Sequence, residues 1–345
     1  MSMNTSTSTS ILIGFVVSFL SKTICVSSPT EIVSYEIRLQ YWGTTEIFVQ
    51  ATATIDRDVS KTALCFLFDS NARINSVSLV GNDSAATPYA RDGDTLRLPD
   101  TVERKGQLCV LFDYSLPMDS LNNGVATLFR WYPYLLDNLA KYKLTASTTK
   151  DYMIISSGAL STGGGDYVWE VQTPVPRIVL VIAKSDAYTV ITRTSTRKEA
   201  TFYFLNGDTA FIRDTSVQRR FIGESLDAFG FCNEVIGPYN YDALAFVEIP
   251  DLQYVDSEPT LILMGSSFLN IYRKNQYDWP AHELAHQWFG SGVFGKHSDL
   301  KRWCFFEPLA EYLRLMFTGE NRKESVDRKI EAIVAEYKSD YLGKE

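Results

Sequence analysis

Residues 279–290 read Trp-Pro-Ala-His-Glu-Leu-Ala-His-Gln-Trp-Phe-Gly, and this stretch decides how the rest of the chain is interpreted. Pro280 suits the first turn of a helix, where a missing N–H costs nothing. Residues four apart lie on one helical face, so His282 and His286 can direct their imidazoles at one point. Glu283 lies beside that point. The chain has only 3 histidines, so finding two of them at this spacing is informative.

Two converging imidazoles predict a divalent metal site, for which zinc is the natural ion. Hydrolytic zinc also needs a third protein ligand and an open position for water. Residues 303–313 carry apolar positions at helical spacing, and Pro308 suits the start of that helix, which places Glu307 at its mouth. We predict Glu307 as the third ligand and Glu283 as the general base. The alternative is an amphipathic core helix that happens to carry two histidines.

Two further side chains lie near these candidates in sequence. Glu311 follows Glu307 by four residues, and we expect it to be a solvated carboxylate or a neighbour of the ligands. His297, next to Lys296 in a loop, is expected to be exposed rather than a ligand.

The motif His-Glu-Leu-Ala-His-Gln-Trp-Phe-Gly, followed by Trp-x-x-x-Glu-x-Leu-Ala-Glu-Tyr, resembles the aminopeptidase N-like family of gluzincin zinc metallopeptidases. The resemblance implies one zinc ion bound by His282, His286 and Glu307, with Glu283 activating water. The family usually leaves eighteen residues between the second histidine and the ligand glutamate. Here twenty intervene, and Phe305 stands at the family's position. We interpret this as an insertion in the loop 290–299, where length changes are tolerated.

Two other departures concern the substrate site. Where family aminopeptidases carry Gly-x-Met-Glu-Asn, whose glutamate holds the substrate's amino terminus, this chain has a different sequence over 254–260. Glu258, or Asp256, is then our candidate for binding an ammonium group; a solvated acidic loop is the alternative. The family's oxyanion-donating tyrosine has no counterpart at the usual distance, and losing such a donor costs about 10²–10³-fold in turnover. Candidates by residue type alone are Tyr312, Tyr337 and Tyr341.

Length and composition set broader limits. A chain of 345 residues with 45% hydrophobic and 13% aromatic content can bury large cores and should form about two domains. The net charge of −8 and the lack of a basic run exclude nucleic acid as an expected partner.

The amino terminus carries an apolar run over residues 11–20, which is too short to span a bilayer but suits a secretory signal. An uncleaved signal anchor or a buried strand are the alternatives. This segment predicts a secreted or extracytoplasmic protein. Of the remaining cysteines, Cys65 and Cys109 lie in similar settings and either pair across strands or stay free and buried.

Short apolar and alternating runs between 32 and 190 predict an antiparallel β-sandwich or saddle. Residues 189–197 suggest a linker. Beyond it we expect a helix over 215–236 and strands over 243–249 and 261–264 that lead into the metal-binding helix. The α+β fold class then has three parts, which are 1–28 as signal peptide or anchor, 29–190 as β domain, and 191–345 as a thermolysin-like domain, apparently shortened at its carboxyl end.

These observations predict a zinc-dependent metallopeptidase, in the first place an aminopeptidase, that acts on peptides or proteins. The alternatives are a weakly active or inactive module that binds zinc or peptide, and a zinc endopeptidase.

Overall fold

The computed structural model describes residues 30–57, 64–80, 86–99, 106–118, 121–135, 138–163, 165–195, 198–207, 214–273, 279–293 and 299–322. The expected signal segment, the loop residue His297, and the tyrosines at 337 and 341 lie outside these ranges. None of the described helices is both long and apolar enough to cross a bilayer.

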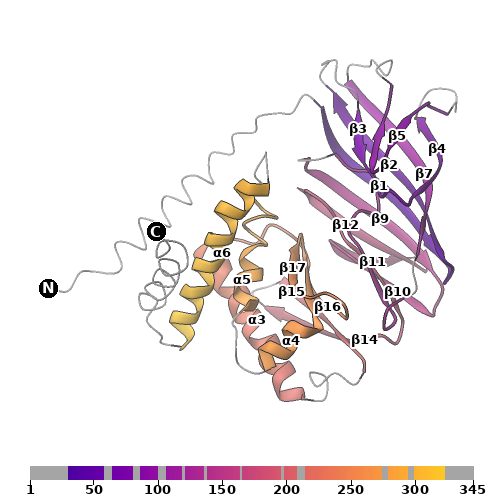
Figure 1. The fold of residues 1–345 in the computed structure, drawn as a ribbon. Coiled ribbons are helices and arrows are strands. Elements are labelled where there is room, and N and C mark those ends of the chain that lie inside the picture. Colours follow the sequence, from indigo (N-terminus) through magenta and orange to yellow (C-terminus); the bar gives the residue numbers. More distant parts are fainter. Residues whose placement is uncertain are drawn as a thin grey trace, which may run out of the picture.

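A seven-stranded sheet dominates the first half of the chain and follows the order β11-β12-β9-β1-β2-β7-β4 (Figure 1). All neighbours pair antiparallel except β1 and β9, which are parallel. Alternate side chains of the central strands β1, β2, β7 and β9 enter the core, which is the pattern expected of a sheet with one solvated face. The strands are β1 (Thr30–Tyr41), β2 (Glu46–Arg57), β4 (Arg73–Leu79), β7 (Gly106–Pro117), β9 (Ala140–Thr148), β11 (Ala159–Gly163) and β12 (Asp166–Val175).

Two small antiparallel sheets complete this half. Their orders are β10-β13-β8 and β3-β6-β5. Cys65 is exposed, Cys109 is half-buried and both are free, so the predicted pairing is not formed and the alternative of buried thiols is wrong as well. The strands are β3 (Cys65–Leu67), β5 (Ala90–Asp92), β6 (Thr95–Arg97), β8 (Val125–Leu128), β10 (Tyr152–Ser156) and β13 (Leu180–Lys184).

A mixed five-stranded sheet organises the second half, in the order β14-β15-β16-β18-β17. The central strands β15, β16 and β18 are parallel, and the edge strands β14 and β17 are antiparallel to their neighbours. Every residue of β16 and β18 is buried, as expected for strands covered on both faces. The strands are β14 (Tyr188–Ser195), β15 (Lys198–Leu205), β16 (Leu244–Ile249), β17 (Val255–Glu258) and β18 (Leu261–Gly265).

The linker predicted over residues 189–197 is wrong. Most of it belongs to β14, which pairs with β15 from Tyr188–Leu205 through Ser195–Lys198. Threonines suit strands because their branched side chains fit a pleated surface, so this Thr-rich segment forms an edge strand rather than a tether. The division at 190 and 191 stays a prediction.

The helices pack together beside this sheet (Figure 1). Asp214 caps the first of them, because its carboxylate accepts the backbone N–H groups of Ser216 and Val217. The ring of Phe221 then contacts Phe246 in the sheet and Trp279 in the helix that carries the His-Glu-x-x-His motif, which we call the metal-motif helix. The helices are α3 (Thr215–Val235), α4 (Ser266–Arg273), α5 (Trp279–Ala285) and α6 (Asp299–Arg322).

The last helix corrects one prediction. Pro308 lies inside α6 instead of at its start, so Glu307 is in the body of the helix and not at its mouth. A proline within a helix forfeits one backbone hydrogen bond and crowds the preceding turn. Burial of one face on both sides of Pro308 offsets that cost, and the buried residues recur at helical spacing as Phe306, Ala310, Leu313 and Phe317.

Candidate metal centre

The two motif histidines come from one helical turn. His282 lies in α5 and His286 follows its last residue directly. The His286 N–H still reaches the His282 carbonyl at 3.4 Å, so the helical spacing continues past the assigned end. The Nε2 atoms of the two rings lie 3.2 Å apart.

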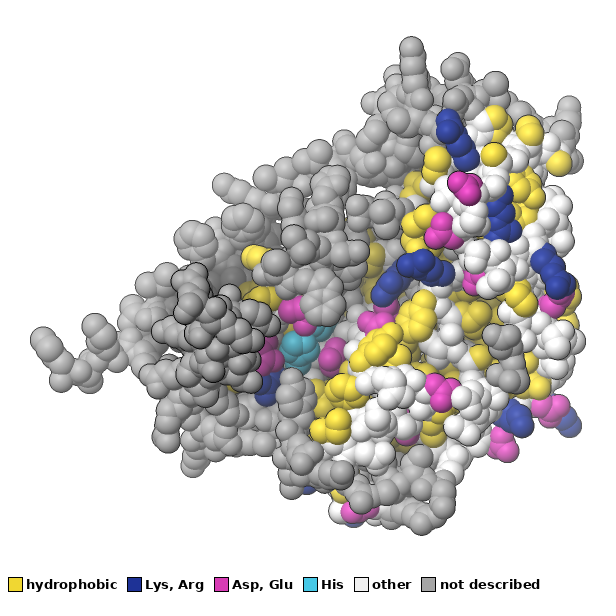
Figure 2. All heavy atoms as spheres, viewed as in Figure 1, with side chains coloured by type: hydrophobic (Ala, Val, Ile, Leu, Met, Phe, Trp, Pro, Cys, Tyr) yellow, Lys and Arg dark blue, Asp and Glu magenta, His cyan; other side chains and the backbone are white. Residues whose placement is uncertain are grey.

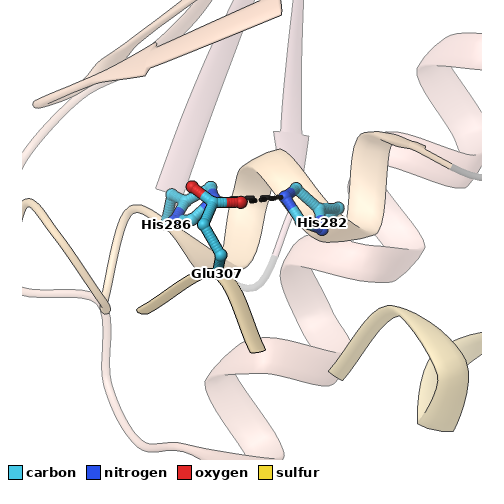
Figure 3. A group of neighbouring side chains, drawn as sticks. All are labelled: His282, His286 and Glu307. Atoms are coloured by element: carbon cyan, nitrogen blue, oxygen red, sulfur yellow. Dashed lines mark hydrogen bonds and ion pairs between the residues drawn. The ribbon is translucent and has the colours of Figure 1, made fainter. Parts of the chain in front are cut away.

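Glu307 reaches these rings from α6, which packs against α5. Its Oε2 lies 3.2 Å from His282 Nε2, and its Oε1 lies 3.3 Å from His286 Nε2. Figure 3 shows the Glu307 carboxylate and both imidazoles directed at one another. The structure therefore brings together the three side chains predicted as ligands.

The tautomers follow from the other ring nitrogens. His282 Nδ1 lies 3.3 Å from Glu311 Oε2, and His286 Nδ1 lies 3.1 Å from the Phe289 carbonyl oxygen. Both partners are acceptors, so each Nδ1 is assigned a hydrogen, which leaves each Nε2 to bind a metal ion or, once protonated, to donate to Glu307. When both rings are neutral, their Nε2 lone pairs repel at 3.2 Å unless a proton or a metal ion lies between them.

The spacing of the donor atoms tests whether zinc fits. Atoms about 2.1 Å from a tetrahedral zinc ion are about 3.4 Å from each other. The two Nε2 atoms lie 3.2 Å apart, and each lies 3.2 or 3.3 Å from a different Glu307 oxygen, so these separations are close to that edge length. Two imidazoles and a carboxylate are also a ligand set that zinc takes in hydrolytic sites. The residues present therefore fit a zinc ion.

The pKa values of these groups report a strongly anionic surrounding. Burial lowers the pKa of His282, but hydrogen bonds to Glu307 and Glu311 outweigh it and raise that pKa to about 9. Hydrogen bonds from His282 and His286 hold the pKa of the Glu307 carboxyl well below its usual range. A site with these properties stabilises positive charge, whether a proton or a metal ion supplies it.

Glu311 is a neighbour of the ligands, as the sequence suggested. It lies one helical turn beyond Glu307, so both carboxylates face the same His282 ring from opposite nitrogens. Arg314 donates Nε–H to Glu311 at 2.8 Å and also bonds it through Nη2. Burial raises the pKa of Glu311, but Arg314 and His282 lower it to about 2 overall. Carboxylates placed in this way orient a metal-binding histidine and fix its tautomer.

Glu283 is placed to act as a base. It lines the same cavity as the three predicted ligands. Burial raises the pKa of its carboxyl, and the two histidines oppose that rise, which leaves the pKa at about 7. A group with that pKa can both take and release a proton near neutral pH.

The cavity beside these residues has a volume of about 370 Å³, enough for a short peptide segment. Figure 2 shows a histidine at the bottom of a hollow, with acidic side chains around it. One side, which we call the helical wall, consists of His282, Glu283, His286 and Glu307. The other side, the strand wall, consists of residues 254–259 together with Pro176 and Arg177.

Comparison with known proteins shows what this architecture is. No protein-family profile matches the sequence, and no curated protein matches it. Among solved structures, an M1 zinc metallopeptidase from Deinococcus radiodurans is similar with a TM-score of 0.68 at 15% identity, covering 90% of this chain and 75% of that one. Yeast LTA4 hydrolase has a TM-score of 0.68 at 13% identity, covering 89% and 51%. This chain has the fold of the M1 zinc metallopeptidases.

Within this M1 fold, the strand wall holds Glu258 differently from what we expected. Arg177 donates Nε–H to Glu258 Oε2 at 2.8 Å and also bonds Oε1 through Nη2. The Glu258 side chain is only 3% exposed, against 41% for Arg177. Burial lowers the pKa of Arg177, but the Glu258 charge outweighs it and raises that pKa. Arg177 thus already supplies the cation that was predicted to come from a substrate ammonium.

Sequence reasoning missed Arg177 altogether. It lies between β12 and β13, 81 residues before its partner, and no motif marks it.

Two other predictions, on Phe305 and on the tyrosines, can be compared with the M1 fold. Phe305, at the family's ligand position, is 54% exposed, while Glu307 faces the rings. Tyr254 is the tyrosine among the described residues that line the cavity, and Tyr312 is not among them.

Proposed function

We propose that this chain is a zinc-dependent metallopeptidase that hydrolyses peptide bonds. The observation that carries the proposal is the spacing of 3.2–3.3 Å among His282 Nε2, His286 Nε2 and the Glu307 oxygens, with Glu283 beside them. The M1 zinc metallopeptidase fold supports the same reaction class.

Each residue has a defined task in this proposal. His282, His286 and Glu307 would hold the zinc ion, which when bound polarises a carbonyl and makes water a stronger acid. Glu283 accepts a proton from the attacking water and delivers it to the nitrogen of the leaving amine. Glu311 and the Phe289 carbonyl keep the two imidazoles in the required tautomers.

The substrate class that we propose is a short peptide with a free amino terminus. The strand wall carries two carboxylates, Asp256 and Glu258, against one cation, Arg177, and this excess of one negative charge favours a cationic amine. One similar M1 metallopeptidase has been solved with the substrate Tyr-Ser-Ala bound. The aminopeptidase assignment rests on this chemistry together with the motif.

The central test replaces Glu283 by Gln. We expect Glu283→Gln to keep stoichiometric zinc and to lose about 10²–10⁴-fold in peptide hydrolysis, because the ligands remain but the proton acceptor is gone. Metal content and cleavage of an aminoacyl-aminocoumarin panel are the two measurements. Glu234→Gln on α3 is the matched control and should change neither. Undiminished cleavage by Glu283→Gln would remove Glu283 from the reaction.

An endopeptidase is the second candidate, and one observation favours it. Arg177 already bonds both Glu258 oxygens, so this carboxylate has less capacity for a substrate amine. Internally quenched peptides with acetylated amino termini separate the two activities. Cleavage of these peptides that stops on adding a chelator supports an endopeptidase, whereas cleavage only of free amino termini supports an aminopeptidase.

A module that binds zinc or peptide without cleaving it is the third candidate. It is favoured by the cavity lining, because Tyr312, the described candidate for an oxyanion donor, is not among the described lining residues. Zinc-loaded protein that binds peptides tightly and cleaves none of the panel would support this alternative.

A further inference from the structure

Gln287 is a motif residue to which the proposed reaction gives no task. It directly follows the predicted ligand His286, and it is 1% exposed. An amide side chain offers two acceptor sites on Oε1 and two hydrogens on Nε2, and burial makes each unsatisfied one costly. The partners of this amide therefore show what it does.

All of these positions have a partner, and three of the four partners lie on or next to the strand wall. Oε1 accepts the Thr260 N–H at 2.9 Å, and it shares the Tyr239 hydroxyl hydrogen, at 3.1 Å, with the Ala243 carbonyl oxygen at the same distance. Nε2 donates to Ser257 Oγ and to the Glu258 carbonyl oxygen, both at 2.8 Å. The Ser257 hydroxyl in turn donates to the Glu283 carbonyl oxygen at 2.9 Å. One buried amide thus joins the metal-motif helix to β17 and to the turn that follows.

The turn at Thr260 is held from three sides. Its φ of +63° is uncommon for a β-branched residue, so the surrounding contacts must impose it. Gln287 accepts its N–H, Ala245 donates an N–H to its carbonyl at 2.8 Å, and Gly158 donates an N–H to its Oγ1 at 2.6 Å. Gly158 has a φ of +107°, and a Cβ at this position would lie 2.5 Å from the Glu170 backbone carbonyl oxygen, so only glycine fits here.

These contacts link three parts of the molecule at one point. Gly158 belongs to the turn between β10 and β11, in the β-rich first half, and Thr260 precedes β18. Arg177, from the same first half, is anchored on Glu258 two residues earlier. The main chain of the Glu258–Thr260 turn is bonded to Gln287 at both ends.

We propose that Gln287 is a positioning residue that fixes the distance between the strand wall and the metal-binding helix. This inference rests on the proposed peptidase function, because the two walls must be a set distance apart to hold a peptide over the metal site. Gln287 does not touch the predicted ligand atoms. Its effect is on the shape of the cavity and on peptide binding.

The test variant is Gln287→Glu. It keeps the shape of the side chain but replaces the two hydrogens of Nε2 with an acceptor that faces the Glu258 carbonyl. Gln218→Glu on α3, another buried glutamine, is the matched control for placing a charge in the interior. Both substitutions are made in the full chain, alone and together with Glu283→Gln, which keeps the peptide intact.

Three measurements are made on cobalt-loaded protein, namely amide hydrogen exchange over 255–265, the affinity for trialanine by calorimetry, and the affinity and visible absorption of Co²⁺. We expect Gln287→Glu to speed exchange and to weaken trialanine binding by about tenfold each, since two buried hydrogen bonds are lost. Cobalt affinity should stay within about threefold, with an unchanged spectrum, because the ligand atoms are untouched. Gln218→Glu should leave exchange over 255–265 and trialanine binding unchanged.

Unchanged exchange and unchanged trialanine affinity in Gln287→Glu would overturn the proposal. A changed cobalt spectrum would overturn it too, because Gln287 would then act through the ligands. If Gln287→Glu does not fold, Ser257→Ala removes the Ser257 link alone; we expect about threefold weaker trialanine binding at constant cobalt affinity, and no change contradicts the proposal.

The same experiment separates this inference from the proposed function. If the unaltered protein cleaves no peptide but exchange over 255–265 responds to Gln287→Glu, the peptidase function fails while the positioning role stands. If the protein cleaves peptides and Gln287→Glu alters neither exchange nor binding, the positioning role alone fails.

Discussion

The helical wall and the strand wall of the cavity handle charge in opposite ways. On the helical wall, His282, His286 and Glu307 direct lone pairs and a carboxylate at one another over 3.2–3.3 Å, an arrangement that a cation must complete. On the strand wall, Arg177 and Glu258 satisfy each other, and Gln287 bonds the backbone beside them.

This difference separates chemistry from shape. The helical wall directs several ligand atoms at one point and can therefore bind a cation. The charges of the strand wall are largely paired with each other, so this wall mainly maintains the shape of the cavity. Changes to the helical wall should therefore appear in metal binding. Changes to the strand wall should appear in stability and in peptide affinity, with metal binding preserved.

The largest expected effect is on the helical wall. Glu307→Ala removes a predicted ligand, and we expect zinc affinity to fall by more than the roughly 100-fold upper range for residues that only support ligands. Competition with a fluorescent zinc chelator measures it. Glu234→Ala on α3 is the control. If Glu307→Ala binds zinc as tightly as the unaltered protein does, the contrast between the walls is wrong at its main point.

The next effect is on the strand wall. Arg177→Ala leaves the Glu258 carboxylate buried without its partner, so the free energy of unfolding should fall by about 2 kcal/mol, below the roughly 3–5 kcal/mol of a fully buried pair because Arg177 is partly exposed. Urea denaturation measures it, and Arg193→Ala, at an exposed arginine, is the control. Zinc affinity should not change. Adding Glu258→Gln to Arg177→Ala should restore part of the lost free energy of unfolding. If it restores none, the destabilisation does not come from the unpaired Glu258 carboxylate.

A smaller effect is expected from Glu311. Glu311→Gln keeps an acceptor for His282 Nδ1–H but removes the charge that strengthens that bond, so zinc affinity should fall by about tenfold. The chelator competition used for Glu307 applies here. A loss as large as that of Glu307→Ala would mean that Glu311 is itself a ligand.

The smallest effect concerns the sheet that carries the strand wall. Glu248 on β16 is 1% exposed and accepts hydrogen bonds from Ser266 Oγ and the Leu205 N–H, and burial raises its pKa. A carboxyl whose pKa is raised on folding stabilises the protein below its unfolded pKa, and this contribution is lost as pH rises through the folded pKa. Glu248→Gln should remove that pH dependence and change stability by about 1 kcal/mol at most. Urea denaturation between pH 4 and pH 8 checks it, and an unchanged pH profile would contradict it.

Much of the helical wall could be predicted because its geometry is local. Residues four apart on a helix must share a face, so His282 and His286 converge by periodicity alone, and Glu311 follows Glu307 by the same rule. The α+β fold class was predictable for a similar reason, because strand alternation and helical spacing are written in consecutive residues. The helix start predicted at Pro308 was nevertheless wrong, because packing of α6 overrode the usual preference of proline for a first turn.

The strand wall could not be predicted, because its contacts join distant segments. Arg177 finds Glu258 across 81 residues, and Gly158 finds Thr260 across 102. Neither pairing leaves a periodic trace in the sequence. The linker over 189–197 failed for a related reason, because whether a Thr-rich segment becomes an edge strand depends on a neighbour being there to pair with it.

The location of Glu307 inside the 24-residue helix α6, two turns from its start, has a practical consequence. A carboxylate held on a helix of this length should keep its position when the metal ion is removed. The arrangement of the three predicted ligands should therefore persist without the ion. We therefore expect dialysis against a chelator to give a folded apoprotein that recovers full occupancy as soon as metal is returned, with no refolding delay.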